Sequence, residues 1–331
     1  MRGLVVTEAG SCSWQDIAEP EVGPYDALVS IEACGVCSST DRKLLDCRLG
    51  WQPKPPFVLG HEAVGRVTAV GDKVRNFALN DRVTRPVAWW PGTGPMGVGI
   101  GGFAERGIVR DAHAMHADGD TSLDQDYLAQ RQVVIPGELE PGTAALGITL
   151  AETASVMRHL GPLRGAQVAV ADTGCVGLSF MRWAKLAGTR VFGLGRRSER
   201  LDAGRHNGAD LAIDTRDPDW SEQLAAASDG LDVVIDTTCD IGVCAGLSAA
   251  RKPDGRACAY GAPPDGHHYP PEWTTAVVEE HFAWPWIADL LVRGWIDPAD
   301  FITHRYEREA SVDVFDSIAK GEVIKAVVDL V

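Results

Sequence analysis

The sequence of 331 residues lacks the marks of a membrane or secreted protein. No segment contains the roughly 18 consecutive apolar residues that a membrane-spanning helix needs, and the first ten residues lack the apolar core of a signal peptide. No run of lysine and arginine interrupts a net charge of −15. Because an acidic surface repels polyanions, we expect neither nucleic acid nor a membrane as a partner. A cytoplasmic location is predicted by default from the lack of a membrane-spanning segment and a signal peptide. A small substrate bound in a cleft remains compatible with this charge.

Cysteine usage excludes two further kinds of site. The eight cysteines are scattered, and without a secretion signal they do not predict a disulfide framework. Cys34 and Cys37 form a C-x-x-C pair, but a structural zinc site would need a second pair nearby, and the sequence has none. Residues 84–113 contain no cysteine at all.

Two different sequence patterns divide the chain. Up to about residue 148 it is rich in glycine and proline, and its short alternating runs predict an irregular antiparallel β domain. From about 149 to 283, β-like runs alternate with amphipathic segments such as 178–187. The β-like runs are residues 166–171, 189–194, 231–236 and 255–261. This alternation predicts an α/β fold with a doubly wound parallel sheet, covered by helices on both faces.

The turn after the first of these runs predicts a dinucleotide site. It reads Asp172-Thr173-Gly174-Cys175-Val176-Gly177. This is the G-x-G-x-x-G fingerprint with aspartate in place of its first glycine. Gly174 lets the backbone approach the pyrophosphate, which rests on the helix N-terminus, and Gly177 lets the helix pack against the sheet. Val176 belongs to the same predicted cofactor site.

The end of the second run predicts which dinucleotide is bound. NAD enzymes usually place an acidic residue there for the ribose 2′-hydroxyl. This chain instead has Gly195-Arg196-Arg197-Ser198. No acid repels a 2′-phosphate, and two arginines and a serine are available to bind it, so we predict NADP(H). The alternative is that both arginines are solvated charges at a helix start.

The first 148 residues contain a second set of motifs. They are G-V-C-S-S-T-D (35–41), G-H-E-A-V-G (60–65), V-G-D-K-V (70–74), N-D-R-V (80–83) and G-G-F-A-E (101–105). With these motifs, the turn at 174–177 and I-T-H-R at 302–305, the chain resembles the medium-chain dehydrogenase/reductase superfamily, in its zinc-dependent alcohol and polyol branch, over essentially its whole length.

The resemblance implies a domain organisation. A GroES-like catalytic domain would comprise residues 1–148, completed by 284–331, and a Rossmann domain would comprise residues 149–283. The resemblance also implies a small-molecule alcohol or carbonyl substrate and a homo-oligomer, either a dimer or a tetramer.

The resemblance also implies a catalytic zinc. Cys37 and His61 match the first two ligands, and zinc prefers thiolate and imidazole. Glu62 follows as in the family, where it acts near the metal, although by itself it could be only a neighbouring carboxylate. The family's third ligand is a cysteine or a glutamate just before the Rossmann domain. Residues 138–165 contain no cysteine, and Glu152 lies in a segment similar to that of polyol and glucose dehydrogenases, so we predict it as the third ligand.

Two departures from the family pattern matter. The family usually has cysteine, one residue, serine or threonine, then aspartate, whereas this chain is one residue longer. The relay hydroxyl is therefore Thr40 or Ser39, and we favour Thr40 because it precedes Asp41. The missing four-cysteine lobe predicts one zinc per subunit. The sequence thus predicts a zinc-dependent alcohol dehydrogenase; the alternatives are a zinc-free NADPH-dependent quinone or enone reductase and a non-enzymatic NADPH-binding protein.

Overall fold

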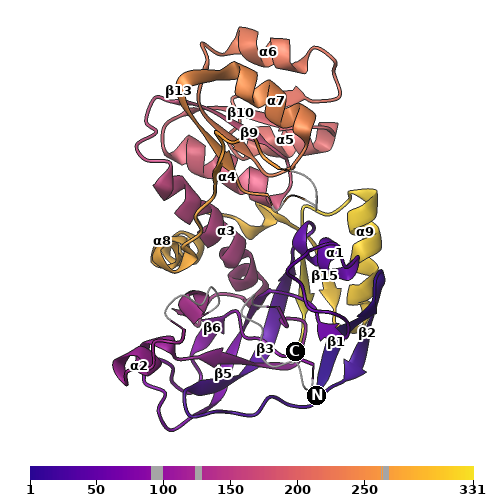
Figure 1. Ribbon diagram of the computed structural model, residues 1–331, viewed down its shortest axis with the longest axis vertical. Helices are drawn as coiled ribbons and strands as arrows, with labels where there is room; N and C mark the ends of the chain where they lie inside the picture. Colours follow the sequence, from indigo (N-terminus) through magenta and orange to yellow (C-terminus); the bar gives the residue numbers. More distant parts are fainter. Residues whose placement is uncertain (91–99, 124–128, 262, 264–267) are drawn as a thin grey trace. The chain divides into compact units, whose positions relative to one another are not determined.

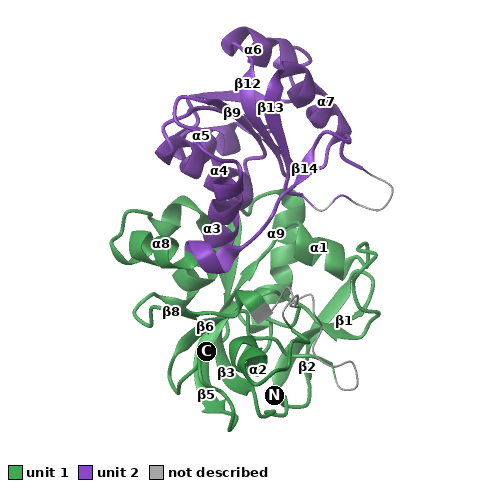
Figure 2. Ribbon diagram, turned by 60° about the vertical axis from the view of Figure 1, so that its left-hand side comes forward, with its two compact units in different colours: residues 1–148, 284–331 green, residues 149–283 purple. Residues whose placement is uncertain are grey.

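The computed structural model describes residues 1–331 except 91–99, 124–128, 262 and 264–267, and it contains two compact units (Figure 1, Figure 2). Unit 1 comprises Met1–Ile148 and Trp284–Val331, and unit 2 comprises Thr149–Ala283. None of the helices in the described part of the chain is long and apolar enough to cross a membrane.

Unit 1 is built on two mainly antiparallel sheets. The smaller has the order β2-β1-β4 and the larger β15-β16-β3-β5-β6-β8, with β7 also paired to β3. The strands are β1 Arg2–Glu8, β2 Ser11–Asp16, β3 Asp26–Val36, β4 Phe57–Val58, β5 Glu62–Val70, β6 Arg82–Thr84, β7 Arg106–Arg110, β8 Val134–Ile135, β15 Ile302–Glu307 and β16 Lys325–Asp329.

Short helices and the C-terminal segment, which contributes β15 and β16, complete unit 1. The helical elements are α1 Thr40–Leu45, α2 Ala112–Ala117, η1 Ala129–Arg131, η2 Pro298–Asp300, η3 Glu309–Asp313 and α9 Val314–Lys320. Strand β16 pairs antiparallel with the end of β3, with Ala326 opposite Val36. The last residues of the chain therefore lie beside the strand that leads to Cys37.

Unit 2 contains a six-stranded parallel sheet among its described residues, in the order β11-β10-β9-β12-β13-β14. Counted from β9, this is the order 3-2-1-4-5-6 of a doubly wound nucleotide-binding fold. The strands are β9 Gln167–Ala171, β10 Arg190–Gly195, β11 Leu211–Asp214, β12 Leu231–Asp236, β13 Arg251–Ala259 and β14 Thr274–Thr275. The intervening helices are α4 Cys175–Leu186, α5 Ser198–His206, α6 Trp220–Ala227 and α7 Ile241–Ala250.

Helices cover both faces of this sheet (Figure 1), which is why its central strands β9, β10 and β12 are mainly apolar and buried. On one face Ala169 and Phe192 pack with Leu224 of α6 and Leu247 of α7. On the other, Gly193 lies against Met181 of α4 so closely that a Cβ there would fall 2.8 Å from the methionine methyl carbon. The predicted fold class is confirmed.

Two long helices contain residues of both units. Helix α3 covers Pro141–His159 and helix α8 covers Glu280–Val292, while the boundaries between the units fall at 148/149 and 283/284. Glu152 lies on the part of α3 after this boundary and therefore belongs to unit 2, whereas Cys37 and His61 belong to unit 1.

Candidate active site

The turn from β9 to α4 has an unusual backbone. Asp172 has φ 139°, a conformation that residues other than glycine rarely adopt. Its Oδ1 accepts a hydrogen bond from the amide of Gly174 at 2.8 Å, which holds the turn. A Cβ on Gly177 would lie 2.2 Å from the Asp172 carbonyl oxygen, so only glycine permits this contact between helix and strand. The aspartate thus replaces glycine without opening the turn.

The carboxyl ends of the first strands enclose a cavity of about 660 Å³. Its lining includes residues 172–174 from the first turn, 195–197 from the end of β10, and Arg200. Arg196 and Arg197 are exposed at the start of α5. Of the other residues predicted for this site, Val176 lies in the first turn of α4 and Ser198 begins α5. The cavity lies where doubly wound sheets bind dinucleotides.

Arg200 was not predicted from the sequence. It is half-buried, and its guanidinium donates to the carbonyl oxygen of Thr173 at 3.3 Å. Burial lowers the pKa of Arg200, and the negative charge of Asp172 offsets part of this decrease. The sequence does offer one signal for this residue, because Arg200 is the third arginine within the five residues from 196 to 200.

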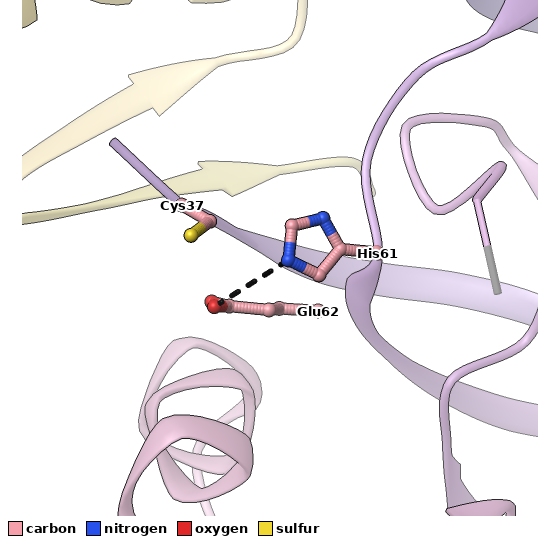
Figure 3. A group of neighbouring side chains, drawn as sticks. All are labelled: Cys37, His61 and Glu62. Carbon is pink, nitrogen blue, oxygen red and sulfur yellow. Dashed lines mark ion pairs between the residues drawn. The ribbon is translucent and has the colours of Figure 1, made fainter. Parts of the chain in front are cut away.

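Unit 1 brings together two of the three predicted zinc ligands, Cys37 and His61, with Glu62 beside them. The ligand atoms of Cys37, His61 and Glu62 all lie within 4.8 Å of one another, and the three side chains converge in Figure 3. Cys37 follows β3 directly, His61 precedes β5, and Glu62 is the first residue of β5. Because β3 and β5 pair with Gly35 opposite Glu62, the register of the sheet sets this cluster.

Asp41 orients two members of the cluster. Its side chain is fully buried; Oδ1 lies 3.0 Å from Nδ1 of His61, and Oδ2 accepts the Cys37 amide at 2.9 Å. This leaves Nε2 of His61 directed toward Glu62, 4.0 Å from its Oε1. Burial lowers the pKa of His61, but the Asp41 carboxylate outweighs it, so the pKa lies well above 6.5. A metal ion displaces such a proton on binding.

Glu62 also has a cationic partner. The ammonium group of Lys325 contacts its Oε2, and both residues are buried. A Cβ on Gly35 would lie 2.5 Å from Oε2 of Glu62 and 3.2 Å from Cε of Lys325. Because glycine has no Cβ, position 35 leaves space for the contact between Glu62 and Lys325. No local sequence pattern pointed to Lys325.

The two candidate relay hydroxyls differ in their surroundings. Thr40 is half-buried at the start of α1, and its amide donates to Sγ of Cys37 at 3.4 Å. Ser39 is exposed, and its Oγ accepts a hydrogen bond from Nζ of Lys43 at 3.1 Å. Thr40 is thus the more sheltered of the two hydroxyl-bearing residues.

Glu152 lies on α3 in unit 2, where it is half-buried. Its Oε2 accepts a hydrogen bond from the phenol of Tyr260 at 3.0 Å. The ring of Tyr260 in turn meets the ring of Phe180 edge-on, with centroids 5.3 Å apart. The carboxylate of Glu152 is therefore held in place by a packed tyrosine, a residue that the sequence did not single out.

The donor set of unit 1 fits zinc. Thiolate, imidazole and carboxylate oxygen are the atoms zinc binds, and a carboxylate behind the imidazole fixes a metal-binding histidine in the required orientation. Within the described residues, Cys37, His61 and Glu62 are the one group of three such side chains close enough to share an ion.

Two family models match the chain. The alcohol dehydrogenase GroES-like domain matches residues 23–119, and the zinc-binding dehydrogenase family matches residues 175–277. The first match contains Cys37 and His61, and the second contains the residues that line the 660 Å³ cavity from Leu194 onward.

Whole-chain relatives agree with these matches. An NADP-dependent isopropanol dehydrogenase from Entamoeba histolytica is 27% identical, over 93% of this chain and 89% of its own length. An L-threonine 3-dehydrogenase from Streptomyces avermitilis is 25% identical, over 99% of both chains. A structure from Sinorhizobium meliloti 1021, of the zinc-binding dehydrogenase type and bound to NADP, is 26% identical with a TM-score of 0.81, covering 99% of this chain and 98% of that one.

Fold, site and relatives together define a zinc-type oxidoreductase of the alcohol dehydrogenase class. The chain belongs to the medium-chain dehydrogenase/reductase superfamily, as its motifs predicted.

Proposed function

We propose that the protein interconverts an alcohol or polyol and the corresponding carbonyl compound, using NADP(H) and one zinc ion per subunit. The observation that carries this proposal is that one chain holds both a Cys37–His61–Glu62 cluster and a dinucleotide cavity with arginines at the end of β10. The relative from Entamoeba histolytica, an NADP-dependent isopropanol dehydrogenase, supports the same reaction class.

Cys37, His61 and Glu152 are the proposed zinc ligands, with Glu62 as an additional carboxylate beside the metal. The bond between Glu62 and Lys325 supports this division, because it already compensates the charge of that carboxylate. The bond from Tyr260 supports Glu152, because ligating carboxylates are usually held by a hydrogen-bond donor. Two anionic ligands, Cys37 and Glu152, would balance the charge of Zn²⁺.

The protein's own residues are proposed to move the proton that the reaction releases. When bound, zinc supplies Lewis-acid polarisation of the substrate oxygen, and the nicotinamide exchanges a hydride with the substrate carbon. Oxidation of the alcohol releases a proton from its oxygen, and the Thr40 hydroxyl is the proposed relay, which accepts this proton while passing its own proton toward solvent. Ser39, hydrogen-bonded to Lys43, is the alternative. Asp41 keeps Cys37 and His61 in position throughout.

The cofactor is held by the two turns that line the cavity. Gly174 and Gly177 allow the close approach of backbone and helix at the pyrophosphate. Arg196 and Arg197, with the hydroxyl of Ser198, are the proposed 2′-phosphate site. A dimer or tetramer and a cytoplasmic location are also proposed, supported by the family resemblance.

Metal analysis and a substrate screen test this function. The full chain should contain one zinc and reduce NADP⁺ with members of a panel of polyols, cyclitols, sugars and aromatic alcohols. Zinc-free protein that reduces quinones or enones with NADPH would identify the zinc-free reductase instead. NADPH binding without turnover over the same panel, extended to carbonyl compounds, would identify a binding protein.

A further inference from the structure

The aspartate at position 172 is a conformational outlier inside the proposed cofactor site. Its φ of 139° is a strained backbone for any residue other than glycine, and the residue lines the 660 Å³ cavity. A strained residue that persists in a ligand cavity suggests a function of its own. The question is what this carboxylate does where two phosphates are expected.

Asp172 removes one donor from the turn. Its Oδ1 accepts the amide hydrogen of Gly174, the residue that caps the N-terminus of α4. The amides at a helix N-terminus are the groups that bind phosphate. The carboxylate therefore occupies one of these amides and adds a negative charge beside the ligand's own charge.

Arg200 supplies a replacement donor at the same turn. Its guanidinium donates to the carbonyl of Thr173, the residue that follows Asp172, and Arg200 lines the same cavity. Arg196 and Arg197, by contrast, lie exposed at the end of β10. Because a guanidinium remains protonated in a folded protein, Arg200 carries its charge at every working pH.

We infer that Arg200 binds the pyrophosphate of the dinucleotide, and that Asp172 makes this contact necessary by occupying the Gly174 amide. Arg200 thus differs in role from Arg196 and Arg197, which address the 2′-phosphate. The inference rests on the proposed function for the identity of the ligand. Asp172 stands at the first glycine position of the fingerprint, whereas Arg200 lies outside the fingerprint.

Two cofactor fragments separate these roles. ADP carries the pyrophosphate without a 2′-phosphate, and 2′-AMP carries the 2′-phosphate without a pyrophosphate. Their dissociation constants for the full chain are measured by calorimetry, with circular dichroism to verify folding of each variant. Arg200→Gln should weaken ADP about tenfold and change 2′-AMP less than twofold. Arg197→Gln, the matched control at the N-cap of the same helix, should do the reverse.

The double variant tests the part played by Asp172. In the Arg200→Gln background, Asp172→Gly frees the Gly174 amide and removes the negative charge, so ADP affinity should return to within about threefold of wild type. Arg200→Lys, which keeps the charge, should retain most ADP affinity and guards against a folding defect in the glutamine variant.

Failure of this inference and failure of the proposed function give different results. If Arg200→Gln weakens 2′-AMP as much as ADP, or the double variant binds ADP no better than Arg200→Gln alone, the inference is overturned while the proposed function stands. If the wild-type chain binds neither fragment, the dinucleotide site itself is wrong, and the proposed function fails with it.

Discussion

The ammonium group of Lys325 contacts the carboxylate of Glu62 across 263 residues of sequence, with both side chains almost completely buried. The pair forms because β16 lies beside β3, while β3 pairs with β5 on its other edge. Burying a carboxylate without a counter-charge is strongly unfavourable. The pair therefore secures the strand that carries the candidate metal site.

Loss of this cation should destabilise unit 1. Lys325→Met keeps the length of the side chain but leaves Glu62 without its lysine, so we expect a loss of about 3–5 kcal/mol in the free energy of unfolding. Urea denaturation at pH 7 measures it. Glu62→Gln combined with Lys325→Met should recover part of the loss; a double variant as unstable as the single one would mean that Lys325 acts through packing alone.

Metal content should distinguish the two candidate carboxylates. Elemental analysis of the wild type should give one zinc per subunit, and Glu152→Ala should lose most activity and much of the zinc while remaining folded. Glu62→Gln should keep its zinc and lose activity only in part. The reverse pattern would make Glu62 the third ligand. Tyr260→Phe, which removes the phenol that holds Glu152, should weaken zinc binding by about tenfold or more.

The cofactor preference should favour NADP(H). We expect it to bind at least about tenfold tighter than NAD(H), roughly 1.4 kcal/mol, because arginines replace an acidic residue at the end of β10. Fluorescence titration with both reduced cofactors measures the ratio. Arg196→Ala should weaken NADPH and leave NADH almost unchanged. Equal affinity of the wild type for the two cofactors would contradict the assignment.

The proton relay should depend on one hydroxyl. Thr40→Val keeps the shape of the side chain and removes the hydroxyl, so we expect kcat to fall by about 100-fold or more, with little change in zinc content. Ser39→Ala should lower kcat less than threefold. If Ser39→Ala and Lys43→Gln instead produce the large loss together, the relay runs from Ser39 to Lys43.

Acid stability should depend on Glu140. Burial alone would raise its pKa, but hydrogen bonds from Arg305 and from backbone amides lower the pKa to about 2. The folded pKa lies below the unfolded value, so the stabilisation is present above about pH 4.5 and is lost as the pH falls toward 2. Because both side chains are nearly half exposed, Glu140→Gln should cost only about 1 kcal/mol or less at pH 7.

The measurement is urea denaturation at pH 7 and at pH 2.5. The difference between wild type and Glu140→Gln should shrink at the lower pH. Glu138→Gln, an exposed neighbour, serves as the control and should show no such change. An equal difference at both pH values would show that the charge of Glu140 is not the cause.

The sequence by itself determined the architecture and the chemical nature of the site. Buried parallel strands are apolar on both faces, so the runs that became β9, β10 and β12 could be located within a residue or two. Glycines and arginines at strand ends marked the turns that are proposed to hold the cofactor, since such turns need backbone freedom or positive charge. Cys37 and His61 were recognisable because they occur in fixed local motifs.

Only the tertiary structure decided which distant groups complete these motifs. Lys325 reaches Glu62 through strand pairing, and Tyr260 reaches Glu152 across 108 residues. Neither contact leaves a periodic or local signal. Arg200 could be counted as a charge, but its bond to Thr173 depends on how α5 packs beside the first turn. Contacts made by side chains from separate elements follow from packing and register, and those are properties of the folded chain.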